Sequence, residues 1–189
     1  MIKNILEYLT NLWYTRDSKN YDRECDKMSR INNKLEQKAN NILVSNDMLK
    51  LPVDLIKIAE NNNIDVYYKE LPEHISGAIK YDNLDRKFKI LLNKSETKNR
   101  IRFTLAHELA HYFLTQKELK ESGEIFIDTM YRQDNSNEQD VDYLAGALLM
   151  DKEILERAYR AIQSISVLAK IFEVSEAAMT VRLIKLGLI

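Results

Sequence analysis

The feature that constrains the fold most is the pentapeptide His107-Glu108-Leu109-Ala110-His111, which lies in a long apolar pattern of helical period. The apolar positions around its polar residues are Ile101, Phe103, Leu105, Ala106, Leu109, Ala110, Phe113 and Leu114. This spacing predicts a buried helix from Thr97 to about Thr115. Because unpaired buried polar groups cost a few kcal/mol each, the rest of the chain must supply partners for the two histidines and the glutamate.

The spacing of the two histidines predicts a metal site. Residues four apart share one face of a helix, so His107 and His111 can offer two imidazoles to one zinc ion. Glu108 projects about 100° around the helix from His107, beside the metal and not onto it. That placement suits a carboxylate that takes a proton from an attacking water molecule. The pentapeptide fixes only three positions and also occurs in unrelated proteins, so its apolar helical context and a third ligand have to support this interpretation.

The third metal ligand has to be His74 or a carboxylate, because the chain has only three histidines. His74 falls in a predicted loop, where a surface histidine is the commoner case. Glu138 and Asp142 are four residues apart on a predicted helix, whereas Asp140 does not share their face. We predict that Glu138 binds the metal and that Asp142 accepts the free N–H of a ligating histidine.

Two further interpretations belong to this region. The residues 137–142 can instead be a solvated acidic helix start, in which carboxylates favour the positive end of the helix dipole. Tyr131 and His74 are candidates to stabilise the oxyanion of a hydrolytic reaction, since such an oxyanion needs a donor besides the metal. A surface or packing role is the ordinary alternative for both side chains.

The remaining periodicities predict an α+β fold that is mainly helical. β-branched and aromatic runs predict strands over 64–68, 76–81 and 87–92, the last two joined as an antiparallel hairpin by turn-forming residues. We expect a small three-stranded antiparallel or mixed sheet beside the pentapeptide helix. Helices are predicted over 2–14, 34–44, 51–61, 137–150, 152–162, 166–172 and 175–186.

Charge and cysteine content exclude several classes of function. The 28 Lys and Arg residues nearly cancel the 29 Asp and Glu residues, so no global basic field is available to hold nucleic acid. Cys25 is the only cysteine, which excludes an internal disulfide and a cysteine metal cluster. No signal peptide and no long uncharged apolar run is present, so we expect a cytoplasmic protein without a membrane partner.

Several stretches together resemble the ImmA/IrrE-type metallopeptidases, over about residues 38–189. The Asn137-Glu138 to Asp142 segment is also similar to the Asn-Glu-x-x-x-Asp arrangement of thermolysin-like gluzincins. The chain departs from the family at Val141-Asp142, where Ala-Asn is usual, and at Asp151, where Pro is usual. The stretches that carry the resemblance are Ile64 to Tyr68, Ile75-Ser76-Gly77-Ala78, Asn99 to His111 with its Arg-Phe-Thr-Leu-Ala-His-Glu core, Glu138 through Leu144 to Met150, and Leu168 to Leu188.

The resemblance implies a zincin-type active-site helix and a zinc-dependent endopeptidase. By position, His107, His111 and Glu138 would bind zinc, or manganese, and Glu108 would be the general base. It also implies site-specific cleavage of a partner protein, typically a helix-turn-helix repressor of the Cro/CI type, which relieves repression in a mobile element, a phage or a stress response. The alternative is a non-proteolytic zinc-binding antirepressor or toxin–antitoxin partner that acts by protein binding.

We divide the chain into three expected parts. Residues 1–37 are an N-terminal helical extension, 38–162 the metallopeptidase domain, and 163–189 a helix-turn-helix-like tail packed on that domain. The second helix of the tail offers only Arg182 and Lys185 as basic residues. A DNA-reading helix needs more such side chains on its exposed face, so we expect packing or substrate recognition there and no direct nucleic-acid binding.

Overall fold

The computed structural model describes residues 29–122, 125–129 and 136–189. The chain divides into two compact units, Met1–Leu35 and Glu36–Ile189. The described part of the first unit, residues 29–35, is helical, and helical structure continues to residue 45 in the second. The helix predicted over 2–14 lies outside the described residues, and so does Tyr131. All the other predicted site residues belong to the second unit.

The second unit contains a mixed sheet with the strand order β1-β3-β2-β4. β1 (Ile64–Lys69) pairs in parallel with β3 (Lys87–Asn93), which pairs antiparallel with β2 (Ile75–Asp82). The β2–β3 hairpin is therefore confirmed, and the Asp82 carboxylate accepts a hydrogen bond from the Leu84 N–H in its turn. The structure adds a fourth strand, β4 (Ile125–Thr129), antiparallel to β2, where we predicted only a short apolar island. In these five residues of an otherwise polar segment, the alternation of apolar and polar side chains is too weak to predict a strand.

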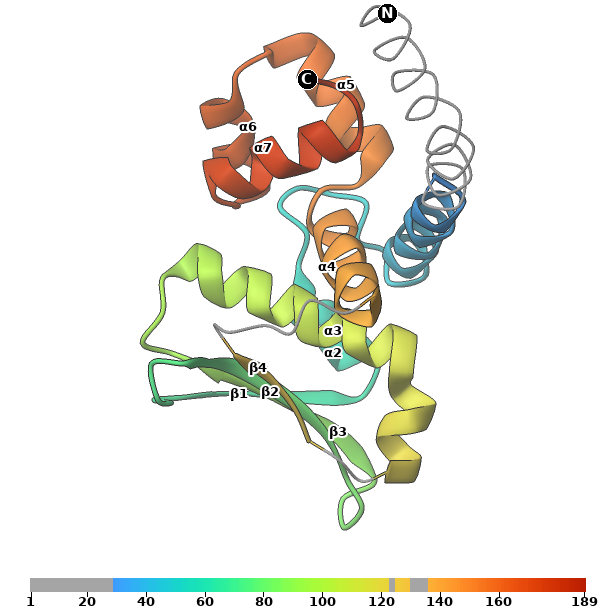
Figure 1. Cartoon of the computed structure of the whole chain (residues 1–189), viewed down its shortest axis with the longest axis vertical. Coiled ribbons are helices and arrows are strands. Elements are labelled where there is room, and N and C mark those ends of the chain that lie inside the picture. The colour runs from blue at the N-terminus through green and yellow to red at the C-terminus, as the bar shows by residue number, and fades with distance from the viewer. Residues whose placement is uncertain (1–28, 123–124, 130–135) are drawn as a thin grey trace, which may run out of the picture. The chain divides into compact units, whose positions relative to one another are not determined.

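The helix α3 (Lys98–Ser122) lies across one face of this sheet (Figure 1). The face toward α3 is formed by alternate strand residues, because side chains of a strand alternate between the two faces. Thr115 has non-helical dihedral angles (φ −129°, ψ 18°) and kinks α3 where we expected the helix to end. α2 (Leu55–Asn61) packs on β1 and α3. The buried residues of this layer include Ile79, Phe88, Ile90, Leu92, Leu105 and Leu109.

Four helices follow the sheet and confirm the mainly helical α+β class. They are α4 (Ser136–Leu149), α5 (Lys152–Ile162), α6 (Ile165–Phe172) and α7 (Glu176–Lys185). Asp151 and Ser175 begin α5 and α7 as N-caps, because their side-chain oxygens accept hydrogen bonds from the Ile154 and Ala178 N–H groups. At position 151, where the family usually has Pro, this chain therefore gains a helix cap.

None of the helices in the described part of the chain has the length and apolarity that crossing a bilayer requires.

Candidate metal centre

The candidate metal centre lies where α4 crosses α3 (Figure 1). The two helices pack on each other, and Ala110 of α3 and Ala145 of α4 are completely buried. Small side chains at a crossing allow helix axes to approach closely. The first turns of α4 carry Glu138 and Asp142, which are thereby brought to the histidine face of α3.

Three donor atoms converge at this crossing. The Nε2 atoms of His107 and His111 are 3.1 Å apart. One carboxylate oxygen of Glu138 lies 3.5 Å from His107 Nε2, and the other lies 3.6 Å from His111 Nε2. Both histidines are almost fully buried, while Glu138 keeps a quarter of its side-chain surface exposed. The three side chains thus form one cluster, which is exposed to solvent at Glu138.

These separations fit a tetrahedral metal ion. Two ligands that each lie about 2.0–2.2 Å from a tetrahedral zinc are roughly 3.3–3.6 Å apart. The separations of 3.1, 3.5 and 3.6 Å lie close to that range, the last two being made by different oxygens of Glu138. Among the described residues this is the one group of three or more metal-ligating side chains whose donor atoms all lie within 4.8 Å of each other. Two imidazoles and one carboxylate are the His₂Glu set of catalytic zinc sites, which leaves one coordination position open.

Asp142 contacts the Nδ1 atom of His107. Its carboxylate oxygen lies 3.0 Å from Nδ1 of His107, on the side of the ring opposite the Nε2 atom that faces Glu138. A carboxylate at this position fixes the tautomer in which Nδ1 carries the proton and Nε2 is left as the metal-binding lone pair. The helical spacing of Glu138 and Asp142 places both carboxylates against His107. Their roles as metal ligand and as supporting acceptor stay predictions.

Glu108 is fully buried between α3 and β2. Gly77 of β2 lies directly against it: a Cβ atom at Gly77 would be 3.3 Å from Glu108 Oε1 and 2.6 Å from Thr104 Cγ2. A glycine inside a strand marks a close approach of this kind. In the sequence Gly77 stands only within the family resemblance, although a glycine inside a predicted strand is itself a signal of such a close approach.

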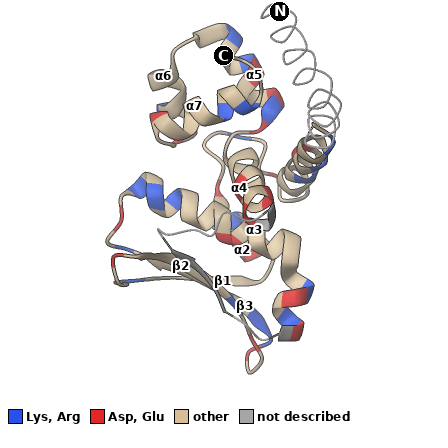
Figure 2. Ribbon diagram, viewed as in Figure 1, with Lys and Arg blue, Asp and Glu red and all other residues tan. Residues whose placement is uncertain are grey.

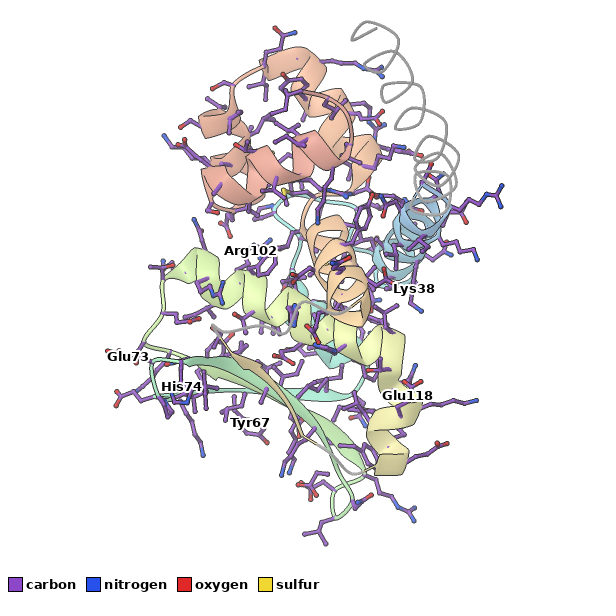
Figure 3. All side chains as sticks on the ribbon, in the orientation of Figure 1. Lys38, Tyr67, Glu73, His74, Arg102 and Glu118 are labelled. Carbon is purple, nitrogen blue, oxygen red and sulfur yellow. The ribbon has the colours of Figure 1, made fainter. Side chains whose placement is uncertain are left out.

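The other candidates do not join the cluster. His74 is exposed in the turn before β2 and lies with Glu73 at one end of the sheet (Figure 3). Asp140 is also outside the group of converging donor atoms. Tyr131 lies outside the described residues, so its assignment as an oxyanion stabiliser stays a prediction.

Arg182 of α7 is buried, and it has a packing role that the sequence left open. Its Nη1 and Nη2 atoms donate to the two carboxylate oxygens of Glu36 at 2.7 and 2.9 Å. Its Nε and Nη2 also donate to the main-chain oxygen of Met150. Arg182 is thus held by contacts within the chain, whereas the absence of nucleic-acid binding by the tail stays a prediction.

The same network changes the electrostatics of Tyr143 on α4. The Tyr143 hydroxyl donates to Glu36 at 2.7 Å. Burial, and then this hydrogen bond, raise the pKa of Tyr143 to about 12. Tyr143 therefore stays neutral across the physiological range and serves as a donor to the carboxylate that Arg182 also binds.

Comparison with known proteins places these features in a family. The family of the IrrE N-terminal-like domain (Peptidase M78) matches residues 59–183, which is more than half of the chain. Among solved structures, a Mycobacterium tuberculosis transcriptional regulator is similar, with a TM-score of 0.59 and 19% sequence identity. The similarity covers 82% of this chain but 48% of that one, so the chain spans about half the length of the regulator. No match is found among curated protein sequences. The family match covers the α3 histidines, Glu108, Glu138 and Asp142, and the chain therefore belongs to the IrrE N-terminal-like metallopeptidase family, as its resemblance to the ImmA/IrrE type predicted.

Proposed function

We propose that this protein is a zinc-dependent endopeptidase that cleaves one partner protein at a specific site, with His107, His111 and Glu138 as the zinc ligands. The observation that carries the proposal is the convergence of three donor atoms at tetrahedral spacing, on a helix that also carries Glu108, in a metallopeptidase family. Zinc is favoured over manganese because two of the three donors are imidazole nitrogens, whereas manganese prefers oxygen-rich sites.

The chain's own residues divide the reaction between them. Zinc, when bound, supplies Lewis acidity at the scissile carbonyl and lowers the pKa of water. Glu108 accepts a proton from the attacking water molecule and passes it to the nitrogen of the departing amine. Asp142 keeps His107 in the ligating tautomer through its 3.0 Å contact with Nδ1. Gly77 leaves room for Glu108 beside β2.

For the substrate we propose a helix-turn-helix repressor of the Cro/CI type, whose cleavage relieves repression. The support for this substrate is the sequence resemblance to ImmA/IrrE-type peptidases. Because such a repressor acts on DNA, its cleavage would take place in the compartment that contains the DNA. The proposed activity is therefore regulatory proteolysis of one bond and not digestion of proteins in general.

The test compares two glutamate-to-glutamine variants of the same helix. Glu108→Gln removes the proposed base, and Glu118→Gln is the matched control because Glu118 is exposed on α3 beyond the kink (Figure 3). Each is co-expressed, in medium supplemented with zinc, with a candidate helix-turn-helix repressor of the Cro/CI type from the same genome, and products are identified by mass spectrometry. We expect one cleaved bond with the wild type and with Glu118→Gln, and none with Glu108→Gln at equal zinc content.

Cleavage by Glu108→Gln at the wild-type rate would rule out Glu108 as the base. A wild-type protein that binds the repressor without cutting it would favour the antirepressor alternative instead.

A further inference from the structure

The strand β1 leaves one edge of the sheet open. It stands first in the strand order, and β3 is its one partner among the described strands. A groove of about 520 Å³ runs along this edge, between β1 and α2. Its lining includes the five consecutive β1 residues 64–68, whereas a groove on one face of a strand would be lined by alternate residues. The groove therefore opens onto the edge of β1 itself.

The main-chain groups of Val66 and Tyr68 point to this open edge. The carbonyl of Lys69 accepts a hydrogen bond from the Lys94 N–H at 2.9 Å, so Lys69 turns its main-chain groups toward β3. The direction of these groups alternates along a strand, and Val66 and Tyr68 therefore turn theirs away from β3. An edge with such groups is a template to which a further strand can add.

The side chains of Asp65, Tyr67 and Lys69 share the face of the sheet away from α3. They alternate with residues such as Ile64, which is buried on the α3 face. Figure 3 shows Tyr67 on the side of the sheet away from α3, and Tyr67 is 44% exposed. Basic and acidic residues both occur on the sheet (Figure 2). On β1 itself an acid and a base lie four residues apart, with a tyrosine midway between them.

Both of these charged residues can take a further partner. Lys87 contacts Oδ1 of Asp65 at 3.2 Å, but the Asp65 side chain remains 35% exposed. A carboxylate has two oxygens and can accept from more than one donor. Lys69 is exposed and forms no ion pair with the residues that the structure describes. An additional strand at this edge can therefore bring a base to Asp65 and an acid to Lys69.

A second copy of β1, antiparallel and centred on Tyr67, supplies both. In this register Val66 of one copy lies opposite Tyr68 of the other, so the main-chain groups at the two edges exchange hydrogen bonds. Asp65 lies opposite Lys69, and Tyr67 lies opposite Tyr67. These pairs have no main-chain bonds between them, which is the arrangement that brings side chains closest. A shift of two residues keeps the main-chain bonds but places Asp65 opposite Tyr67, so both ion pairs are lost.

The helix α2 leaves room for this pairing. Its seven residues span about 10 Å, whereas the six residues of β1 span about 20 Å. Because α2 ends two residues before β1 begins, it can cover only the first half of the strand. A two-fold axis at Tyr67 places the second α2 over the other half. Ile56 of α2, which is 36% exposed and lines the groove, would then flank the added strand.

We propose that β1 is the interface of a symmetric dimer, in which two four-stranded sheets join edge to edge through Asp65–Lys69 and Tyr67–Tyr67 contacts. The interface is isologous, because Asp65 of each copy meets Lys69 of the other. The proposal does not depend on the proposed function, since none of these residues belongs to the candidate metal centre. Because α3 covers the same face of both sheets, the two metal centres would lie on the same side of the joined sheet.

Charge reversal at the interface tests the proposed register. Sedimentation velocity follows the full-length protein from about 1 to about 300 µM, because small interfaces dissociate in the micromolar range. We expect the wild type to dimerise within this range. Asp65→Lys and Lys69→Asp each place two like-charged pairs across the axis, so each variant alone should associate at least about tenfold more weakly. Mixed in equal amounts, the two variants restore both acid–base pairs and should form a heterodimer.

Two matched controls carry the same changes of charge elsewhere. Glu118→Lys alters an exposed residue of α3, and Lys80→Asp alters an exposed residue of β2, a strand with partners on both sides. We expect both proteins to dimerise like the wild type. Tyr68→Pro removes an N–H that points to the open edge and no hydrogen bond within the sheet, so it should fold and remain monomeric.

Cross-linking locates the two-fold axis independently of charge. In the proposed register the Cα atoms of the two Tyr67 residues lie about 4.5 Å apart, within the range that a disulfide can bridge. Tyr67→Cys in a Cys25→Ser background should therefore give a disulfide-linked dimer under mild oxidation. Leu84→Cys in the same background is the control, because Leu84 is 94% exposed in the β2–β3 turn and distant from the axis. We expect little linked dimer from it.

Three results would overturn the proposal. The first is a wild type that stays monomeric over the whole concentration range, which would leave the edge of β1 for a strand of another protein. The second is that Asp65→Lys, Lys69→Asp and Tyr68→Pro dimerise as well as the wild type, or that the two charge variants, shown by circular dichroism to be folded, do not associate when mixed. The third is equal cross-linking at positions 67 and 84.

Discussion

At the scale of single residues, His107 joins the two halves of the candidate site. Its Nε2 atom faces His111 and Glu138, and its Nδ1 atom contacts Asp142. The ring can donate to Asp142 through Nδ1 and offer a lone pair to a metal through Nε2 only when Nδ1 carries the proton and Nε2 does not. In the proposed zinc site Asp142 therefore acts through the histidine, as a positioning residue.

Replacement of Asp142 tests this role with a matched pair of variants. Asp142→Asn keeps an oxygen that can accept from Nδ1, whereas Asp142→Leu has the same branching and no acceptor. We expect Asp142→Leu to weaken zinc affinity by about 10- to 100-fold and Asp142→Asn to stay much closer to the wild type. Competition with a colorimetric chelator measures both affinities. Equal affinities for the two variants would show that the contact with His107 does not support the metal.

Gly77 is a second residue whose neighbours make its replacement informative. Its missing Cβ would lie 2.6 Å from Thr104 Cγ2 and 3.0 Å from the Leu91 main-chain oxygen. We expect Gly77→Ala to lower the free energy of unfolding by about 1–3 kcal/mol, because a packed site has to shift to accept the methyl group. Thr104→Ser removes the closest of these atoms, so the double variant should recover part of that loss in urea denaturation. A Gly77→Ala protein as stable as the wild type would show that the neighbours yield without cost.

At the scale of elements, α4 is fixed at both ends by side chains from other parts of the unit. Glu138 and Asp142 near its start meet the histidines of α3. At its other end the main-chain oxygen of Met150, one of the carbonyls that a helix cannot satisfy internally, accepts from Arg182. α7 thus holds the helix that carries two of the candidate site residues.

Arg182→Ala tests how much α7 contributes through this contact. The change leaves the Glu36 carboxylate and the Met150 oxygen without their arginine, and breaking a buried ion pair costs about 3–5 kcal/mol. Lys185→Ala is the control on the same helix, since Lys185 is exposed and its removal should cost less than about 0.5 kcal/mol. Guanidinium denaturation compares the two proteins. Equal losses of stability would mean that the Arg182 network does not hold the tail.

Local patterns predicted most elements, and their failures have physical causes. The strands over 64–68, 76–81 and 87–92 and the helices from 137 onward follow from strong period-2 and helical spacing, and the structure confirms them. The strand β4 forms through its pairing with β2, and a local sequence pattern does not show such a pairing between distant segments. The pattern of apolar residues does not predict the kink of α3 at Thr115 either. At the kink the Thr115 hydroxyl donates to the His111 carbonyl and competes with the hydrogen bonds of the helix.

At the scale of the whole molecule, the fold class, the family and the metallopeptidase character followed from the sequence, whereas the position of α7 did not. His107, His111, Glu138 and Asp142 could be grouped because each pair is four residues apart on one helix. The position of α7 is set by contacts between residues far apart in the chain, such as those of Arg182 with Glu36 and with the Met150 main-chain oxygen.

We propose that one metal ion is held by His107, His111 and Glu138. Anomalous diffraction from crystals of the zinc-loaded protein, recorded on both sides of the zinc absorption edge, tests this ligand set. We predict a single strong peak about 2.0–2.2 Å from the Nε2 atoms of both histidines and from a Glu138 oxygen. A peak at His74, or no peak between these three side chains in protein shown to contain zinc, would contradict the account.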